Sequence, residues 1–547
     1  MYWKISKTDF ICITVFLIFL GAAFFQGYKS VSELNWGFNN FDSNRDMGFV
    51  HTILNGNYGQ DPSYTNEYIW YNPLVMIIES AIVKITHFPV NTVVTKSGAF
   101  LNLLAPITFF LMMAVIFNVP IALAATTGFL FFNINDLDGW MAATYSPWLF
   151  PVSFAQTFFY TGIIIIYKAF KEWKLFWFIL LGINLAFCFL AHTAPTLLLI
   201  LITVHLSVYK IVKSDPLLKI QAIIDVIKKG LPCLVLFIVL TLPFTWFVVG
   251  KYKLHMINTY TYEYLHEFFQ IKNVFMLFKA NLSLSLLIAM YGCIYFFKMN
   301  KDKVSRLIVS SWIMYCIVLY IYTTAIVFIR YHFNIKFPGI VPSFHFFFYL
   351  KAAQALFFGV GVCHLLSLLY NYMLNLPGKI HYIIIRFEQY MIPLTMVLLV
   401  IINYNSYAHR PDFLFNRTLG LENNIAYDTH KVYEWIVSNA DDSKVFLSNE
   451  NLSDFPLLAS GRKMVAVSPA MSSPYVDYIK RNNDRNKMLD ILSGKESLPA
   501  EDIFKKYNVQ YLLVNKNEKD SMPSIEKYFP VLVYSNDSYF IFYKSTY

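Results

Sequence analysis

Long apolar segments separated by short clusters of lysine and arginine dominate this sequence of 547 residues, of which 57% are hydrophobic and only 14% charged. Such a chain cannot present a polar surface to water, so we predict a polytopic α-helical membrane protein. A bilayer-spanning helix needs about 17–25 residues. About eleven segments reach or approach that length, at 9–26, 97–117, 119–134, 153–170, 174–190, 192–209, 230–250, 281–298, 307–329, 346–372 and 388–404.

The basic clusters predict how these segments are oriented. The first segment follows Lys4 and Lys7 and has the character of a signal anchor with a cytoplasmic N-terminus. Alternate crossing then places the clusters at 168–174, 210–229, 298–306 and 379–386 in the cytoplasm, as the positive-inside rule expects. The net charge of +10 therefore reflects topology and not nucleic-acid binding. We predict a multi-pass protein of the cytoplasmic (inner) membrane.

The same alternation divides the chain into two predicted parts. Residues 1–404 form a transmembrane domain with a first external loop at 28–96, and residues 405–547 form a soluble extracytoplasmic α/β domain. In the second part, short β-type runs alternate with helical stretches. The predicted strands are Lys444–Leu447, Met464–Val467, Val509–Val514, Val531–Tyr534 and Tyr539–Tyr543, and the predicted helices are 428–439, 474–492, 499–507 and 522–528.

One apolar stretch does not fit a full crossing. Residues 72–88 contain Glu79, Lys84 and His87, and a crossing there would invert all later loops. We therefore predict an amphipathic helix that lies along the outer membrane interface. The six cysteines all lie in apolar segments without metal-type spacing, so no disulfide framework or zinc site is predicted.

The first external loop is the richest in chemically active residues. Asp42 and Asp46 are four residues apart, so in a helix both project from one face. Gly56 punctuates a turn further on, and the loop ends in Tyr71-Asn72-Pro73-Leu74. A solvated loop whose acids only keep it out of the bilayer is the alternative.

An early loop aspartate, a glycine about fourteen residues later and an aromatic-Pro-Leu element resemble the GT-C glycosyltransferases over roughly residues 1–200. The resemblance implies an inverting transferase with a polyprenyl-phosphate-linked sugar donor and a glycan, lipid or protein acceptor. It places Asp42 at the catalytic position, with Asp46 as the competing carboxylate. Tyr71-Asn72-Pro73-Leu74 stands where relatives commonly have YPPL or HPPL, so Asn72 replaces one proline.

A second acidic pair, Asp136 and Asp138, lies in the predicted loop after the third span. Two carboxylates on one loop can ligate Mg²⁺ or Mn²⁺ and neutralise a phosphate leaving group. The position resembles the metal-binding DxD of oligosaccharyltransferase catalytic subunits, although their WWDYG acceptor motif is absent here. Acids that cap an interfacial turn are the alternative, so no cofactor is certain.

Transfer from a lipid phosphate also requires cations for the departing phosphate. The late external segment offers Arg330, His332, His345 and Lys351, and His192 lies at another outer span end. Snorkelling anchors and a structural histidine are the alternative interpretations. A transporter or flippase of lipid-linked sugars is a second function class, but the sequence has no internal repeat and its acids lie in external loops rather than in the middle of the spans.

The orientation can be tested with reporter fusions. We expect reporters fused after Lys213 and Lys301 to be cytoplasmic and a reporter fused after Tyr427 to be external, because each follows an assigned crossing. Accessibility of the reporter in intact cells measures the side. A cytoplasmic reporter after Tyr427 would overturn the predicted orientation and the loop assignments with it.

Overall fold

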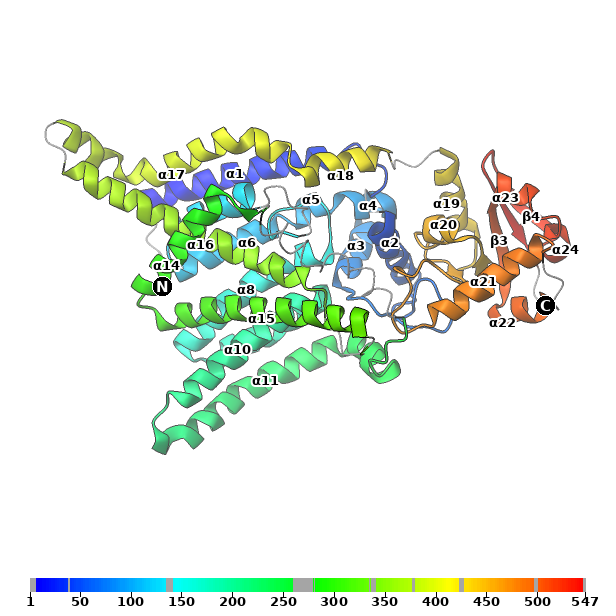
Figure 1. Ribbon diagram of the computed structural model, residues 1–547, viewed down its shortest axis with the longest axis horizontal. Coiled ribbons are helices and arrows are strands. Elements are labelled where there is room, and N and C mark those ends of the chain that lie inside the picture. Colours follow the sequence, from blue (N-terminus) through cyan, green and yellow to red (C-terminus); the bar gives the residue numbers. More distant parts are fainter. Residues whose placement is uncertain are drawn as a thin grey trace. The chain divides into compact units, whose positions relative to one another are not determined.

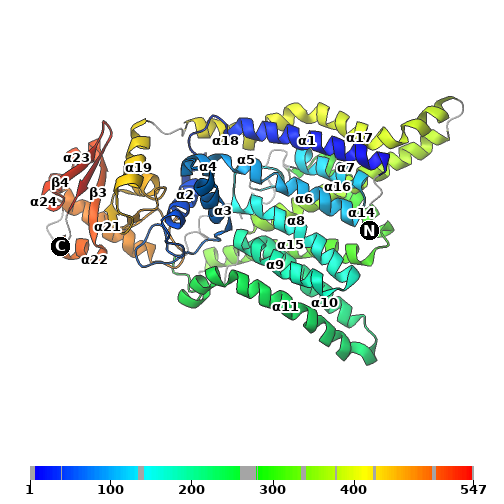
Figure 2. The same ribbon diagram turned by 180° about the vertical axis from the view of Figure 1, so that it is seen from behind.

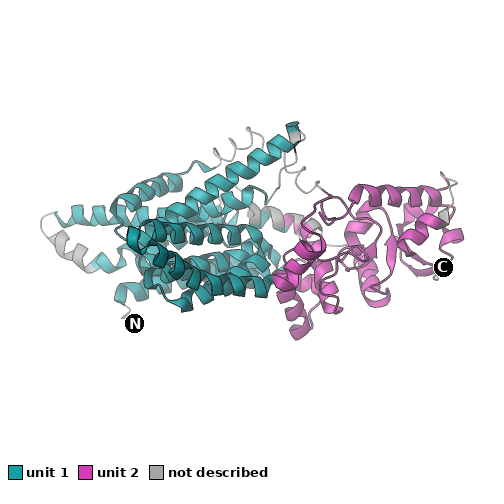
Figure 3. Cartoon of the chain, turned by 90° about the horizontal axis from the view of Figure 1, so that it is seen from below, with its two compact units in different colours: residues 1–32, 96–241, 265–417 teal, residues 33–95, 242–264, 418–547 magenta. Residues whose placement is uncertain are grey.

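The computed structural model describes residues 6–37, 40–133, 141–258, 279, 281–333, 335, 341–375, 379–422, 427–495 and 500–544 (Figure 1). The chain forms two compact units (Figure 3). Unit 1 comprises residues 1–32, 96–241 and 265–417, and unit 2 comprises residues 33–95, 242–264 and 418–547. Residues 33–95, which include most of the predicted first external loop, thus group with the C-terminal segment. The predicted boundary at residue 404 stays a prediction.

Unit 1 is built from long apolar helices. Eight helices among the described residues are long and apolar enough to cross a membrane, and three shorter apolar helices, at Val119–Phe132, Leu175–Ala191 and Leu284–Met299, accompany them. The prediction of a polytopic helical membrane protein is confirmed. The helices are α1 (Lys7–Val31), α5 (Gly98–Leu101), α6 (Leu104–Ile116), α7 (Val119–Thr127), α8 (Pro151–Glu172), α9 (Leu175–Ala191), α10 (Thr193–Val212), α11 (Lys219–Thr245), α14 (Leu284–Met299), α15 (Lys303–Phe333), α16 (Phe344–Leu374), α17 (Lys379–Ala408) and α18 (Pro411–Glu422).

Glycines let some of these helices approach closely. A Cβ placed on Gly292 of α14 would meet the backbone of Phe357 and Gly361 on α16. One placed on Gly359 would lie 2.5 Å from the backbone nitrogen of Ala125 on α7. Apolar lipid gives helices little hydrophobic reason to associate, so close backbone packing at small residues supplies much of their attraction.

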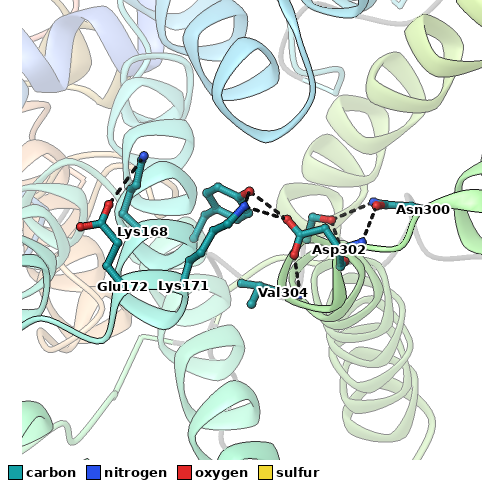
Figure 4. Close-up of polar contacts among 8 residues, drawn as sticks. Lys168, Lys171, Glu172, Asn300, Asp302 and Val304 are labelled. Atoms are coloured by element: carbon teal, nitrogen blue, oxygen red, sulfur yellow. Dashed lines mark hydrogen bonds and ion pairs between the residues drawn. The ribbon is translucent and has the colours of Figure 1, made fainter. Parts of the chain in front are cut away.

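Two of the predicted cytoplasmic basic segments, 168–174 and 298–306, meet in unit 1. Asp302, which precedes α15, accepts hydrogen bonds from the backbone nitrogen of Val304 at 3.2 Å and from the Tyr167 hydroxyl at 2.8 Å (Figure 4). The ammonium group of Lys171 lies 3.5 Å from the same carboxylate. This network joins the C-terminal end of α8 to the α14–α15 connection. The end of α8 and the start of α15 thus lie together, while the predicted orientation of the spans stays a prediction.

Unit 2 contains a five-stranded sheet in the order β2-β1-β3-β5-β4, parallel between β1 and its two neighbours and antiparallel between β5 and its two. Strands and helices alternate in the C-terminal segment as predicted. The strand Lys463–Met464 shares only Met464 with the predicted Met464–Val467, and the short helices Glu450–Leu452 and Lys516–Asp520 were not predicted. The strands are β1 (Val445–Leu447), β2 (Lys463–Met464), β3 (Val509–Asn515), β4 (Val531–Ser535) and β5 (Tyr539–Tyr543). The helices are α2 (Asn40–Leu54), α3 (Leu74–Thr86), α4 (Val90–Lys96), α19 (Tyr427–Asn439), α20 (Glu450–Leu452), α21 (Tyr478–Leu492), α22 (Ala500–Tyr507), α23 (Lys516–Asp520) and α24 (Ile525–Tyr528).

The central strand β3 is buried on both faces of the sheet. Leu513 belongs to the core on one face and Leu512 to the core on the other. Tyr64, from the loop after α2, is fully buried in the first of these cores, and the backbone nitrogen of Met464 donates to the carbonyl of Ser63 at 2.8 Å. These contacts fold the loop against the sheet. Helix α3 forms within the predicted residues 72–88, while its place at a membrane interface stays a prediction.

Two glycine-to-alanine substitutions test the close packing in unit 1. We expect Gly292→Ala to destabilise the protein by about 1–3 kcal/mol, because the added methyl meets the α16 backbone. Gly21→Ala on α1 has nothing within 4 Å of its Cβ, so the gain in helix propensity should stabilise by up to about 1 kcal/mol. Thermal unfolding of the detergent-solubilised protein measures both. Equal shifts of the unfolding temperature in the two variants would contradict the close packing at Gly292.

Candidate active site

An ion-pair network on α2 connects both first-loop carboxylates. Asp42 lies in the first turn of the helix, where the N-terminal dipole favours a negative charge. The Arg45 guanidinium donates from Nη1 to Asp42 Oδ1 at 2.8 Å. It also donates to Asp46 Oδ1, from Nη2 at 2.8 Å and from Nε at 2.9 Å. The two acids therefore project toward the same side of α2, as their spacing predicts.

The two carboxylates differ in burial. The Asp42 side chain is 35% exposed, whereas the Asp46 side chain is 6% exposed. Burial raises the pKa of Asp46 to about 6, although the nearby Arg45 charge opposes the shift. Asp42 is thus the carboxylate of the pair that an external substrate can reach, and Asp46 is the one that holds Arg45 from the interior.

Tyr71 closes one side of this network. Its ring centroid lies 3.9 Å from the Arg45 guanidinium carbon, which is a cation–π contact. Burial raises the pKa of the Tyr71 hydroxyl to about 12, so the phenol stays neutral near pH 7. Arg45 is therefore held by two carboxylates and an aromatic face, an arrangement that fixes its position.

A third carboxyl group, Glu79 on α3, was not among the predicted site residues. It is 1% exposed, and its Oε2 atom has no hydrogen-bond partner among the described residues. Burial raises the pKa of Glu79 well above its ordinary value, and the charge of Asp46 adds to the shift. The sequence did carry a signal, because Glu79 shares the helix face of the buried Val75 and Met76.

The predicted phosphate-binding residues all belong to unit 1. His192 caps α10 by accepting the backbone N–H of Ala194 at Nδ1, at 3.2 Å, and its ring centroid lies 4.5 Å from that of His345. His345 lies in the first turn of α16. The structure therefore brings these two predicted histidines together at one end of the helices.

Lys351 is buried inside the spanning helix α16, with 1% of its surface exposed. Its ammonium group donates to Asn281 Oδ1 at 2.5 Å and to Gln354 Oε1 at 2.9 Å. Arg330 and His332 lie in the last turn of α15, where the His332 ring packs 4.4 Å from that of Phe328. Because α16 follows α15 directly, these two residues lie at the same end of unit 1 as His345.

The acidic pair Asp136 and Asp138 lies outside the described residues. Within the described ranges, no three His, Cys, Asp or Glu side chains are grouped as a metal site requires. The Mg²⁺ or Mn²⁺ site therefore stays a prediction.

Comparison with known proteins shows the fold. No protein family and no curated protein match in sequence. The apo oligosaccharyltransferase of Archaeoglobus fulgidus matches with a TM-score of 0.55 and 10% identity, over 96% of this chain and 73% of that one. ArnT from Cupriavidus metallidurans bound to undecaprenyl phosphate matches with a TM-score of 0.50 and 11% identity, over 98% of each chain. The chain has a GT-C fold. The resemblance stated from the sequence is thus confirmed at the level of the fold.

The raised pKa of Glu79 predicts a pH-dependent difference in stability. As the pH rises, the unfolded chain loses the Glu79 proton first, so this group destabilises the folded protein increasingly above its ordinary pKa. Glu79→Gln removes that effect. We expect the unfolding temperature of the variant to rise relative to that of the unmodified protein between pH 5 and pH 9. Each pH unit by which folding raises the pKa of Glu79 corresponds to about 1.4 kcal/mol in the free energy of unfolding.

Glu434→Gln is the matched control for this measurement. A hydrogen bond from Lys431 lowers the pKa of Glu434. The Glu434→Gln variant should therefore not gain stability relative to the unmodified protein as the pH rises. A pH-independent difference for Glu79→Gln would show that Glu79 is not held in a raised-pKa environment.

Proposed function

We propose that this protein is an integral-membrane glycosyltransferase that moves a sugar from a polyprenyl-phosphate-linked donor to a glycan, lipid or protein acceptor on the outer side of the cytoplasmic membrane. The observation that carries the proposal is the Arg45-bridged carboxylate pair, with one accessible member, on a GT-C fold. The bound undecaprenyl phosphate of the similar ArnT structure supports the class of donor.

In this proposal Asp42 is the general base. It takes the proton from the acceptor group as that group attacks the anomeric carbon of the sugar. The bond between that carbon and the phosphate oxygen breaks, and polyprenyl phosphate leaves with the electron pair. A single displacement inverts the anomeric configuration. Such a base has to be ionised, close and correctly placed.

Arg45 and Asp46 support Asp42 in this role. Arg45 donates a hydrogen bond to Asp42, and its hydrogen bond and ion-pair contact with Asp46 fix the direction of the guanidinium. The Tyr71 ring restricts it from another side. Arg45 and Asp46 are thus positioning residues, and the base keeps its geometry before the acceptor arrives.

The donor phosphate requires positive or neutral hydrogen-bond donors. We assign this role to Arg330, His332, His345 and Lys351, with His192 beside His345. The His192–His345 contact and the buried Lys351 ammonium support the assignment. Metal-dependent transfer, as in an oligosaccharyltransferase, would use Asp136 and Asp138 as ligands.

A transporter of lipid-linked sugars is the second candidate. Lys351 favours it, because an ionisable group buried in a spanning helix often marks a substrate pathway. The two candidates differ in their product, since only the transferase breaks the bond between sugar and phosphate.

Substitution of the proposed base, Asp42, tests the glycosyltransferase proposal. We expect Asp42→Asn to lower sugar transfer by about 10²–10⁴-fold, because the amide keeps the shape but cannot accept the proton. Release of radiolabelled sugar from a polyprenyl-phosphate donor in membranes measures the rate. Asp46→Asn should be milder, since Asp46 acts through Arg45.

Asp490→Asn is the matched control, because Asp490 forms only an exposed ion pair with Lys495 at 3.8 Å. Its transfer rate should be unchanged. Loss of transfer in Asp46→Asn with a silent Asp42→Asn would move the base to Asp46. If neither variant lost sugar transfer, in an assay that detects transfer by the unmodified protein, a general base in the first loop would be refuted.

A further inference from the structure

Two lysines from different helices face one tryptophan at the basic end of unit 1. The ammonium group of Lys210, in the last turn of α10, lies 4.0 Å from the centre of the Trp173 ring, and that of Lys229 on α11 lies 5.4 Å from it. Phe170 and Phe178 hold the indole in place, with ring centroids at 5.5 Å and 5.2 Å. We call Trp173, Lys210 and Lys229 the indole–lysine cluster.

The two lysines of this cluster differ from other lysines at this end of unit 1 in their partners. Other lysines at this end have acidic partners, as Lys171 has in Asp302 at 3.5 Å and Lys174 has in Glu172 at 3.2 Å. Among the described residues, neither lysine of the indole–lysine cluster pairs with a carboxylate. Two ammonium groups on one ring repel each other, and an anion held by both would relieve that repulsion.

The backbone at Trp173 is unusual for so large a residue. Trp173 follows α8 with φ 51° and ψ 37°, in the left-handed region that usually holds glycine at a helix end. Strained conformations of bulky residues concentrate at ligand sites, where the side chain has to be presented in one direction. This conformation directs the indole to the two lysines.

The surface next to the cluster is apolar. A Cβ placed on Gly182 of α9 would lie 2.5 Å from the carbonyl oxygen of Cys233 on α11, so these helices meet backbone to backbone one turn beyond Lys229 (Figure 2). From there α11 exposes a row of aliphatic side chains, namely Leu231, Leu234, Val235, Ile238 and Val239. A ligand that fits both surfaces is an amphiphile with an anionic head.

We propose that the indole–lysine cluster binds the phosphate of an anionic glycerophospholipid whose acyl chains lie along α11. Both ammonium groups donate to the phosphate oxygens, and the indole supports the headgroup at the interface, where tryptophan is favoured. Basic sites between spanning helices recognise anionic headgroups in this way. A choline headgroup would instead add a cation beside the two lysines.

Native mass spectrometry of the detergent-solubilised full chain tests this site. Phosphatidylglycerol is the probe, and phosphatidylcholine is the neutral comparison. Each basic residue near an anionic lipid contributes about fivefold to binding. We therefore expect Lys210→Gln combined with Lys229→Gln to weaken phosphatidylglycerol binding by about 25-fold, with little change for phosphatidylcholine.

The control combines Lys213→Gln and Lys228→Gln, which remove the same charge from the same helix pair but leave the indole–lysine cluster intact. It should keep most of the phosphatidylglycerol binding. Unchanged binding in the Lys210/Lys229 variant, or equal losses in both variants, would overturn the proposal. So would binding of polyprenyl phosphate in preference to phosphatidylglycerol. Thermal unfolding checks that both variants remain folded.

Discussion

The bilayer restricts which backbone structures unit 1 can adopt. No water is present in the hydrocarbon region, so every backbone N–H and carbonyl group has to be hydrogen bonded within the chain, and helices meet this demand locally. The apolar surface that the spans require gives them little reason to associate in lipid. Specific association of the helices then depends on how closely their surfaces fit together. Backbone contacts at Gly292 with Gly361, and at Gly182 with Cys233, are the result.

Charged groups at the ends of the helices of unit 1 have different partners from those inside the spans. At one end of unit 1 the lysines meet carboxylates, as Lys171 meets Asp302, or an aromatic ring, as Lys210 meets Trp173. Lys351, inside a spanning helix, has two amide oxygens as hydrogen-bond acceptors. Lys171 thus has an oppositely charged partner, whereas the partners of Lys351 are neutral amide groups.

The sequence predicted the features that depend on local pattern. The strands and helices of residues 427–543 follow from short apolar runs and turn residues, and the spans follow from length and apolar content. Features that depend on distant contacts were missed. Tyr64 packs against Val432 and Ile436, far along the chain, so no local signal placed residues 33–95 in unit 2. Glu79 was read only as a polar residue of an interfacial helix, although its spacing puts it on the buried face.

The burial of Glu79 bears on which carboxylate would act as the base in the proposed reaction. Arg45 contacts the carboxylates of Asp42 and Asp46, and Asp46 in turn lies near the carboxyl group of Glu79. Desolvation raises the pKa of both Asp46 and Glu79. The charge of Asp42 raises the pKa of Asp46 further, and the charge of Asp46 raises the pKa of Glu79 further. Asp46 and Glu79 are both buried, so an external group has little access to either carboxyl group. Asp42 shares the Arg45 charge, yet 35% of its side chain remains exposed to an approaching acceptor. Of the three carboxyl groups, Asp42 is therefore the one that an approaching group can reach, whereas the buried Asp46 contacts Arg45 through two nitrogen atoms and fixes its position.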